Sequence, residues 1–212
     1  SSYLAGLQEL EHPDQEPVYQ YPWIFPVRRE MMAGLLRSTE KSGCFAFDTY
    51  SPIGKHTWSA VLGSARLAWQ GAGLILASEK LVYAICRPPG HHAGSDCIGG
   101  YCYLNNAALA GSRLLELGPG AIIDIDYHHG NGTQEIFWNN PNVLTISIHA
   151  DPAEEYPYFS GFADETGSED AKGAHINIPL GKGCTDADYL YALDLAIKAI
   201  KNFTPRLTWL VL

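Results

Sequence analysis

The 212-residue sequence has little charge and no excess of basic residues, and each shortage argues against a class of protein. Only 17% of the residues are charged, and 23 acidic residues against 14 basic ones leave a net charge of −9. This balance argues against nucleic acid as a partner and favours cationic ligands. The sequence has no run of about 18 apolar residues, so it predicts no contact with a membrane interior.

Cysteine is scarce and irregularly spaced. The five cysteines stand at positions 44, 86, 97, 102 and 184, without a C-x-x-C motif and in an odd number. We therefore predict reduced thiols and a cytoplasmic location. Metal coordination by Cys97 and Cys102 is the minor alternative.

Apolar periodicity alternates between helix and strand and predicts an α/β fold with a mainly parallel sheet. Helices are expected at 59–77, 105–116 and 186–203, and strands at 81–86, 121–126, 143–149 and from 207 onward. The strands are rich in β-branched residues and almost continuously apolar, as in sheets covered on both faces. With 46% hydrophobic residues, the chain is long enough to bury a substantial core.

The predicted organisation is a single domain over residues 1–212. Residues 1–42 combine a helix-like start with a long proline-rich loop, and residues 43–212 form a metal-binding α/β core. An apolar strand reaches the last residue without a cap, and the first residues already lie in an amphipathic pattern. We expect from these features that the natural protein extends beyond both ends.

An apolar strand that ends in alternating acids and histidines is the strongest functional signal. Residues 120–132 read G-A-I-I-D-I-D-Y-H-H-G-N-G. Because alternate side chains of an extended chain share a face, Asp124, Asp126 and His128 are expected on one side of the strand's carboxyl end. Zinc accepts this mixture of carboxylate and imidazole ligands. A pair of solvated acids beside a structural histidine is the alternative.

A histidine pair follows another apolar segment. Residues 81–94 read L-V-Y-A-I-C-R-P-P-G-H-H-A-G, and the prolines and glycine end the predicted strand. His91 and His92 are then expected at the carboxyl end of a strand, where open α/β sheets bind ligands. A tandem pair beside a metal predicts acid–base chemistry, whereas a lone histidine is more often structural.

Three motifs, in this order, resemble the histone deacetylase superfamily. They are R-P-P-G-H-H-A-G at 87–94, G-G-Y-C-Y-L-N-N-A-A at 99–108 and D-I-D-Y-H-H-G-N-G-T-Q at 124–134. Looser segments at 25–29, 47–54 and 149–161 are similar to the bacterial acetylpolyamine amidohydrolases. The resemblance implies a three-layer α/β/α fold of the arginase/deacetylase type, incomplete in this chain.

The activity implied by the resemblance is zinc-dependent removal of acetyl groups from acetylated polyamines. Asp126 and His128 match two zinc ligands, while the third ligand and a catalytic tyrosine are expected beyond residue 212. The 212-residue chain alone is therefore expected to be inactive. The alternatives are an acetyl-lysine deacetylase of the histone deacetylase type and a non-catalytic binding domain. An arginase-type two-manganese centre is disfavoured, because Gly130 stands where a further carboxylate is needed.

The resemblance also implies roles for the histidine pair. His92 is the implied general base, oriented by the side chain of Asn131, and His91 pairs with Asp124. An asparagine at position 131 in place of an aspartate is expected to leave His92 less basic. His129 is expected to support the metal ligands without binding the zinc. The remaining candidates, His56, His149 and His175, are expected to be structural.

Potassium is the second implied cation. The match carries its site to Asp124, Asp126, Ser147 and the main-chain carbonyls of His128 and Ile148. Oxygen ligands suit such a hard cation, although Ser147 equally suits a hydrogen bond to a neighbouring backbone group. A possible second monovalent site is implied at Phe137, Asn140 and Val143.

A slender acylated amine needs a narrow apolar slot with aromatic walls. The resemblance assigns those walls to Tyr101 and Tyr156 and gives the Gly100 carbonyl to the substrate amide N–H. Acids of the early loop, Glu30, Glu40 and Asp48, are candidates to meet distal ammonium groups, with solvated surface charge as the alternative. A homodimer is implied by the resemblance alone.

Overall fold

One parallel sheet forms the centre of the computed structural model, which describes residues 19, 21, 22, 24, 34, 37 and 41–212. Its four strands lie in the order β3-β2-β1-β4, with every neighbouring pair parallel. The strands are β1 (Gly120–Asp124), β2 (Val143–Ala150), β3 (His175–Leu180) and β4 (Leu207–Val211).

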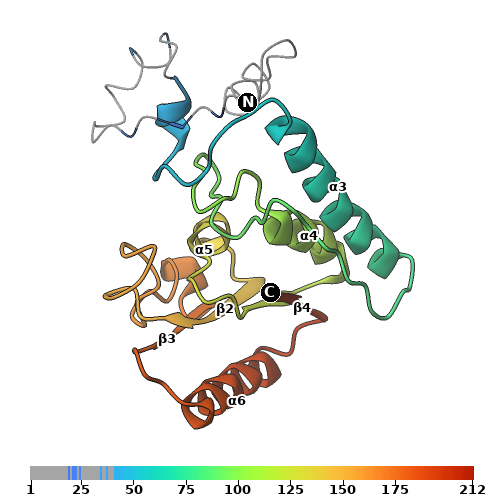
Figure 1. Cartoon of the computed structure of the whole chain (residues 1–212). Coiled ribbons are helices and arrows are strands. Elements are labelled where there is room, and N and C mark those ends of the chain that lie inside the picture. Colours follow the sequence, from blue (N-terminus) through green and yellow to red (C-terminus); the bar gives the residue numbers. More distant parts are fainter. Residues whose placement is uncertain (1–18, 20, 23, 25–33, 35–36, 38–40) are drawn as a thin grey trace.

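Helices cover both faces of this sheet and complete the three layers (Figure 1). The helices are α3 (Thr57–Leu76), α4 (Asn106–Leu114), α5 (Asn131–Phe137) and α6 (Asp186–Phe203). Short 3-10 helices are η2 (Lys41–Phe45), η3 (Leu115–Leu117) and η4 (Glu169–Ala171). None of the described helices has the length and apolar character needed to cross a membrane.

Alternate residues of the central strands enter different hydrophobic clusters. Ile123 and Ile146 pack with Ala196 of α6, whereas Ile122 packs with Ala108 of α4 and, on α5, Phe137. Because both faces of β1 and β2 are covered, all of their residues are buried, as the continuous apolar runs predict. The predicted α/β fold with a mainly parallel sheet is confirmed.

Several predicted elements agree with the structure, and two were not predicted. The helix at 186–203 has the predicted bounds, and its Thr185 forms a capping box with Asp188. The expected helices at 59–77 and 105–116 correspond to α3 and to α4 followed by η3. The short elements β3 and α5 were missed. The predicted start and loop over residues 1–42 lie almost wholly outside the described residues.

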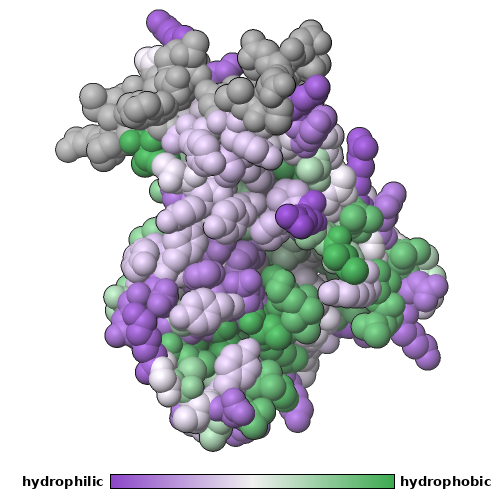
Figure 2. Space-filling view, viewed as in Figure 1, coloured by the Kyte–Doolittle hydropathy of each residue, from purple (hydrophilic) through white to green (hydrophobic). Residues whose placement is uncertain are grey.

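The predicted strand at 81–86 is wrong. These residues pair with no strand among those described, and Leu81, Tyr83 and Ile85 are 88%, 74% and 73% exposed. An apolar alternating sequence becomes a strand only when a neighbour completes its hydrogen-bonded ladder. β4 lies at the edge of the described sheet, where it pairs with β1, and its residues alternate between half-buried and exposed instead of being fully buried as predicted. Figure 2 shows apolar side chains on the face of the molecule where Figure 1 places β4 and α6.

His175→Ala is expected to destabilise the fold by about 2–3 kcal/mol. His175 is 1% exposed, hydrogen-bonds Thr145 Oγ1 through Nδ1, and donates from Nε2 to the Phe137 carbonyl at 3.1 Å. Removing the ring deprives the buried Thr145 hydroxyl of this partner and leaves the Phe137 carbonyl with one hydrogen bond, from Asn140 N, in place of two. Denaturant unfolding measures the loss, and His56→Ala, at an exposed position, is the matched control with almost no effect. Equal stability of the two variants would contradict this structural role.

Candidate active site

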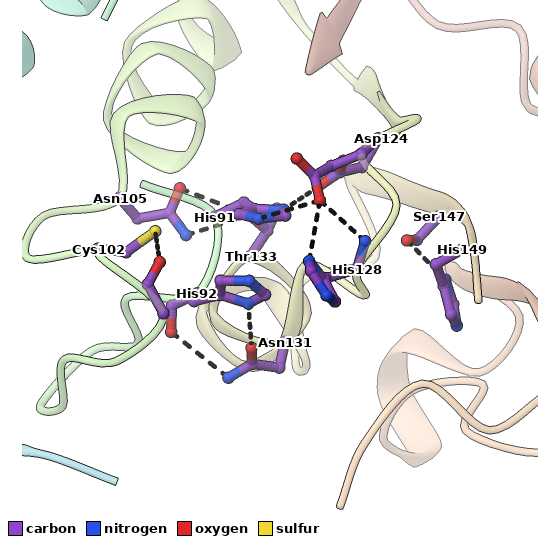
Figure 3. Close-up of polar contacts among 12 residues, drawn as sticks. His91, His92, Cys102, Asn105, Asp124, His128, Asn131, Thr133, Ser147 and His149 are labelled. Carbon is purple, nitrogen blue, oxygen red and sulfur yellow. Dashed lines mark hydrogen bonds and ion pairs between the residues drawn. The ribbon is translucent and has the colours of Figure 1, made fainter. Parts of the chain in front are cut away.

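The loop after β1 brings two of the predicted metal ligands together. The strand ends at Asp124, and each acid then accepts a backbone N–H two residues further on. Asp126 N lies 3.0 Å from Asp124 Oδ1, and His128 N lies 2.8 Å from Asp126 Oδ1. The strand was predicted to reach Asp126, but it ends at Asp124. Beyond that point the Asp124 and Asp126 carboxylates accept backbone N–H groups that a neighbouring strand would otherwise bond. The turn still places Asp124 and His128 near one another at the end of β1 (Figure 3), and Asp126 Oδ1 lies 3.7 Å from His128 Nδ1.

Asp126 and His128 fit two ligand positions of one zinc ion. Their Oδ1 and Nδ1 atoms are 3.7 Å apart, and the side chains are 35% and 39% exposed. Two ligands that each lie about 2 Å from a metal stand at most about 4 Å from one another, which this separation satisfies. Among the residues that the structure describes, no group of three His, Cys, Asp or Glu side chains converges on such a site. The pair could therefore supply two of the three protein ligands that a catalytic zinc ion needs.

His91 is tied to Asp124 in the interior of the site. His91 Nδ1 lies 2.9 Å from Asp124 Oδ2, and both side chains are almost completely buried. A Cβ atom on Gly130 would lie 2.4 Å from the same carboxylate oxygen, so only glycine permits this close approach. The predicted pairing of His91 with Asp124 agrees with this geometry.

Asn131 fixes the tautomer of His92. The Asn131 amide nitrogen donates to the His92 carbonyl at 3.4 Å, which turns its Oδ1 toward His92 Nδ1 at 2.8 Å. Because Oδ1 only accepts, His92 Nδ1 must carry the hydrogen, and Nε2 is left as the basic atom. The sequence-based pairing of these two residues agrees with the structure.

The two neighbouring imidazoles favour opposite charge states, although their ring centroids are only 4.0 Å apart. Burial disfavours the charged form of His91, but the charge and hydrogen bond of Asp124 outweigh it and raise the pKa of His91. Burial and then the charge of His91 lower the pKa of His92 to about 3. At neutral pH, His92 is therefore uncharged and able to accept a proton, whereas Asp124 favours the protonated form of His91.

Aromatic side chains flank the histidines and the metal-ligand pair. The ring of Tyr156 stands edge-on to His92 at 4.9 Å and to His128 at 5.5 Å. Tyr101 is 61% exposed and lies next to Gly100, whose carbonyl accepts a hydrogen bond from Cys102 Sγ at 3.3 Å. Two of the predicted slot residues, Gly100 and Tyr156, thus lie beside His92.

Asp48 has a different place from the predicted one. Its carboxylate accepts hydrogen bonds from the backbone of Tyr50 and Gly100 and from the hydroxyl of Tyr156. A carboxylate with these three donors is not a free surface charge. The other two predicted acids, Glu30 and Glu40, lie outside the described residues.

Further buried polar residues lie behind the site on β2. Ser147 is the register partner of Asp124, and its hydroxyl hydrogen-bonds His149 Nδ1 at 2.8 Å. His149 Nε2 donates to the Gly161 carbonyl at 2.9 Å, in keeping with the predicted structural role. The ring of His129, 1% exposed, lies 4.6 Å from that of His149. Burial, followed by the charge of His149, lowers the pKa of His129 to about 2, so it stays neutral.

Comparison with known proteins decides the family. The histone deacetylase domain matches residues 6–211, nearly the whole chain. The chain belongs to the histone deacetylase family. The family resemblance predicted from the three motifs is thereby confirmed.

Named relatives of this deacetylase-family chain include bacterial acetylpolyamine amidohydrolases. Acetylpolyamine amidohydrolase 2 of Pseudomonas aeruginosa is 44% identical over 190 residues, which cover 86% of the chain and 54% of the relative. The enzyme of that name from Mycoplana ramosa is 44% identical over 181 residues, covering 84% and 53%. The chain thus spans about half the length of these curated relatives.

A solved structure agrees with the deacetylase fold. The acetylpolyamine aminohydrolase of Burkholderia pseudomallei superposes with a TM-score of 0.89 at 34% identity. The match covers 99% of this chain and 62% of that one. A histone deacetylase homologue solved in complex with SAHA superposes with a TM-score of 0.77 at 25% identity.

Proposed function

We propose that the protein is a zinc-dependent deacetylase that hydrolyses acetylated polyamines to acetate and free amine. The observation that carries the proposal is the Asp126–His128 pair beside His92, whose Nε2 atom is neutral and unprotonated. The names of the most similar relatives support the substrate class.

The residues of this chain divide the reaction between them. Asp126 and His128 would hold the zinc, which when bound polarises a carbonyl oxygen and makes water more acidic. His92 Nε2 accepts a proton from the attacking water and returns it to the leaving amine. The His91 imidazolium, stabilised by Asp124, offsets negative charge that develops on the former carbonyl oxygen.

A potassium ion is proposed behind the zinc. Its ligands would be Asp124, Asp126, Ser147 and the carbonyls of His128 and Ile148, and the paired register of Asp124 with Ser147 supports this grouping. The second monovalent site stays a prediction. Its Phe137 carbonyl already accepts hydrogen bonds from His175 Nε2 and Asn140 N, so a cation there would replace one of them.

The proposed substrate is a slender cationic acylamine, in keeping with the net charge of −9 and the aromatic residues Tyr101 and Tyr156. We expect the protein at its natural length to cleave acetylputrescine or acetylcadaverine at least about tenfold more efficiently than an acetyl-lysine peptide. An N-acetyl alkylamine of equal length lacks the distal ammonium and is expected to show a higher KM. Added salt should shrink that difference, because it screens exposed charges.

An acetyl-lysine deacetylase is the alternative function. Histone deacetylase 8 of Arabidopsis thaliana is 39% identical over 73% of the chain, which favours this reading. A preference for acetyl-lysine peptides in kcat/KM, or indifference to the distal ammonium, would decide for it. We further propose a cytoplasmic homodimer, whose subunit number is measured by light scattering.

A further inference from the structure

Asp48 lies where the chain runs beside the Gly100 segment. Ala46 forms a parallel bridge with Ile98, and Phe47 N donates to the Ile98 carbonyl at 3.0 Å. This pairing brings the Asp48 carboxylate to the Gly100 amide, where Oδ2 accepts its N–H at 2.9 Å. The Asp48 side chain is itself held in place, because Oδ1 accepts the backbone N–H of Tyr50 at 2.9 Å.

The same Asp48 oxygen reaches the opposite wall of the slot. Oδ2 also accepts the hydroxyl of Tyr156 at 2.5 Å, although the two residues are 108 positions apart in the sequence. Burial and then this bond raise the pKa of Tyr156, so its hydroxyl remains a donor. A single carboxylate oxygen thus connects the two segments assigned to the slot.

The backbone at Gly100 and Tyr101 needs such support. Gly100 and Tyr101 have φ angles of +52° and +65°, and left-handed backbone at a tyrosine persists only when its surroundings hold it. A Cβ atom on Gly100 would lie 2.3 Å from His92 Cδ2 and 2.8 Å from Tyr156 Oη. The turn at Gly100 is therefore packed directly against the proposed base and the opposite wall, and a small shift of either wall alters the slot.

We propose that Asp48 is a positioning residue that fixes the width of the substrate slot, holding Gly100 on one side and Tyr156 on the other. The inference rests on the proposed deacetylase function but gives this acid a role other than binding a distal ammonium group. Charge-assisted hydrogen bonds of this kind are short and directional, which suits a spacer between two walls. A slot of fixed width accepts a linear methylene chain and rejects a bulkier one.

The test compares Asp48→Asn, Tyr156→Phe and the double variant at the natural length of the protein. Asparagine keeps the size of Asp48 but loses its charge, and we expect kcat/KM for acetylcadaverine to fall about tenfold, chiefly through KM. The preference for acetylcadaverine over an N-acetyl amine that carries a branch on its methylene chain should narrow, because a wider slot admits the bulkier chain. Since Asp48→Asn weakens the Asp48–Tyr156 bond and Tyr156→Phe removes the same bond, the double variant should be no worse than the poorer single variant within about twofold.

Asp151→Asn is the matched control, because Asp151 Oδ1 also accepts a backbone N–H two residues on, at 2.9 Å, without reaching the slot. It should leave both substrates and their ratio unchanged. Equal losses for both substrates in Asp48→Asn, or additive effects in the double variant, would reduce Asp48 to a purely structural residue. A crystal structure of Asp48→Asn with Gly100 and Tyr156 unmoved would overturn this inference alone, whereas a wild-type protein that cleaves no acetylated amine would overturn the proposed function.

Discussion

His92→Ala is expected to lower turnover of an acetylated amine by about 100-fold or more while leaving the zinc content unchanged. His92 Nδ1 is committed to Asn131, so Nε2 is the atom available to accept a proton. Among the described histidines, His92 alone has both a lowered pKa and a ring that lies close to the rings of His91 and Tyr156. Steady-state kinetics and metal analysis on the same preparation measure both quantities.

His91→Ala is the companion variant and should lower turnover less, because it removes a stabilising charge but leaves the proton acceptor. Its buried partner Asp124 loses an ion pair, so its stability must be measured as well. Turnover of His92→Ala within about threefold of wild type would remove His92 from proton transfer, because loss of a general base costs far more.

Asp126→Ala is expected to abolish stoichiometric zinc binding and, with it, activity. Asp126 and His128 form the proposed ligand pair, so the variant leaves a single ligand there. Metal affinity depends steeply on the number and geometry of the ligands. Zinc titration of the natural-length protein measures the loss. Asp164→Ala, at an exposed position outside the motifs, is the control that should retain full zinc. One zinc per chain in Asp126→Ala would show that the metal site lies elsewhere.

The sequence predicted the helix and the strands of the central layers because the features that form each element lie within that element's own residues. The helix Asp186–Phe203 carries its own capping residues and apolar stripe, and the buried runs of β1 and β2 require cover on both faces. The segment at 81–86 has an equally strong apolar pattern, yet it forms no strand without a described neighbour to pair with. A strand also needs a neighbouring strand for its backbone hydrogen bonds, and the apolar pattern of one segment does not show whether that neighbour exists.

In the candidate site, too, local spacing predicted some residues but not those that meet through tertiary packing. Asp126 and His128 were predicted because alternate residues of an extended strand share a face, and in the structure a short turn brings them together instead. The histidine pair was found by its tandem spacing. The bond from Tyr156 to Asp48 joins residues from distant segments, so spacing could not reveal it. Asp48 stood out only as an acid, and its role depends on tertiary packing.

Acetate release and metal content, measured together on one preparation at natural length, test the central claim most directly. The apo protein, prepared with a chelator, should release no acetate from acetylputrescine. Addition of zinc should restore full activity at one ion per active site, and Asp126→Ala should fail to respond. Two tightly bound metal ions per subunit, or acetate release that survives complete removal of zinc, would contradict a one-zinc deacetylase built on Asp126 and His128.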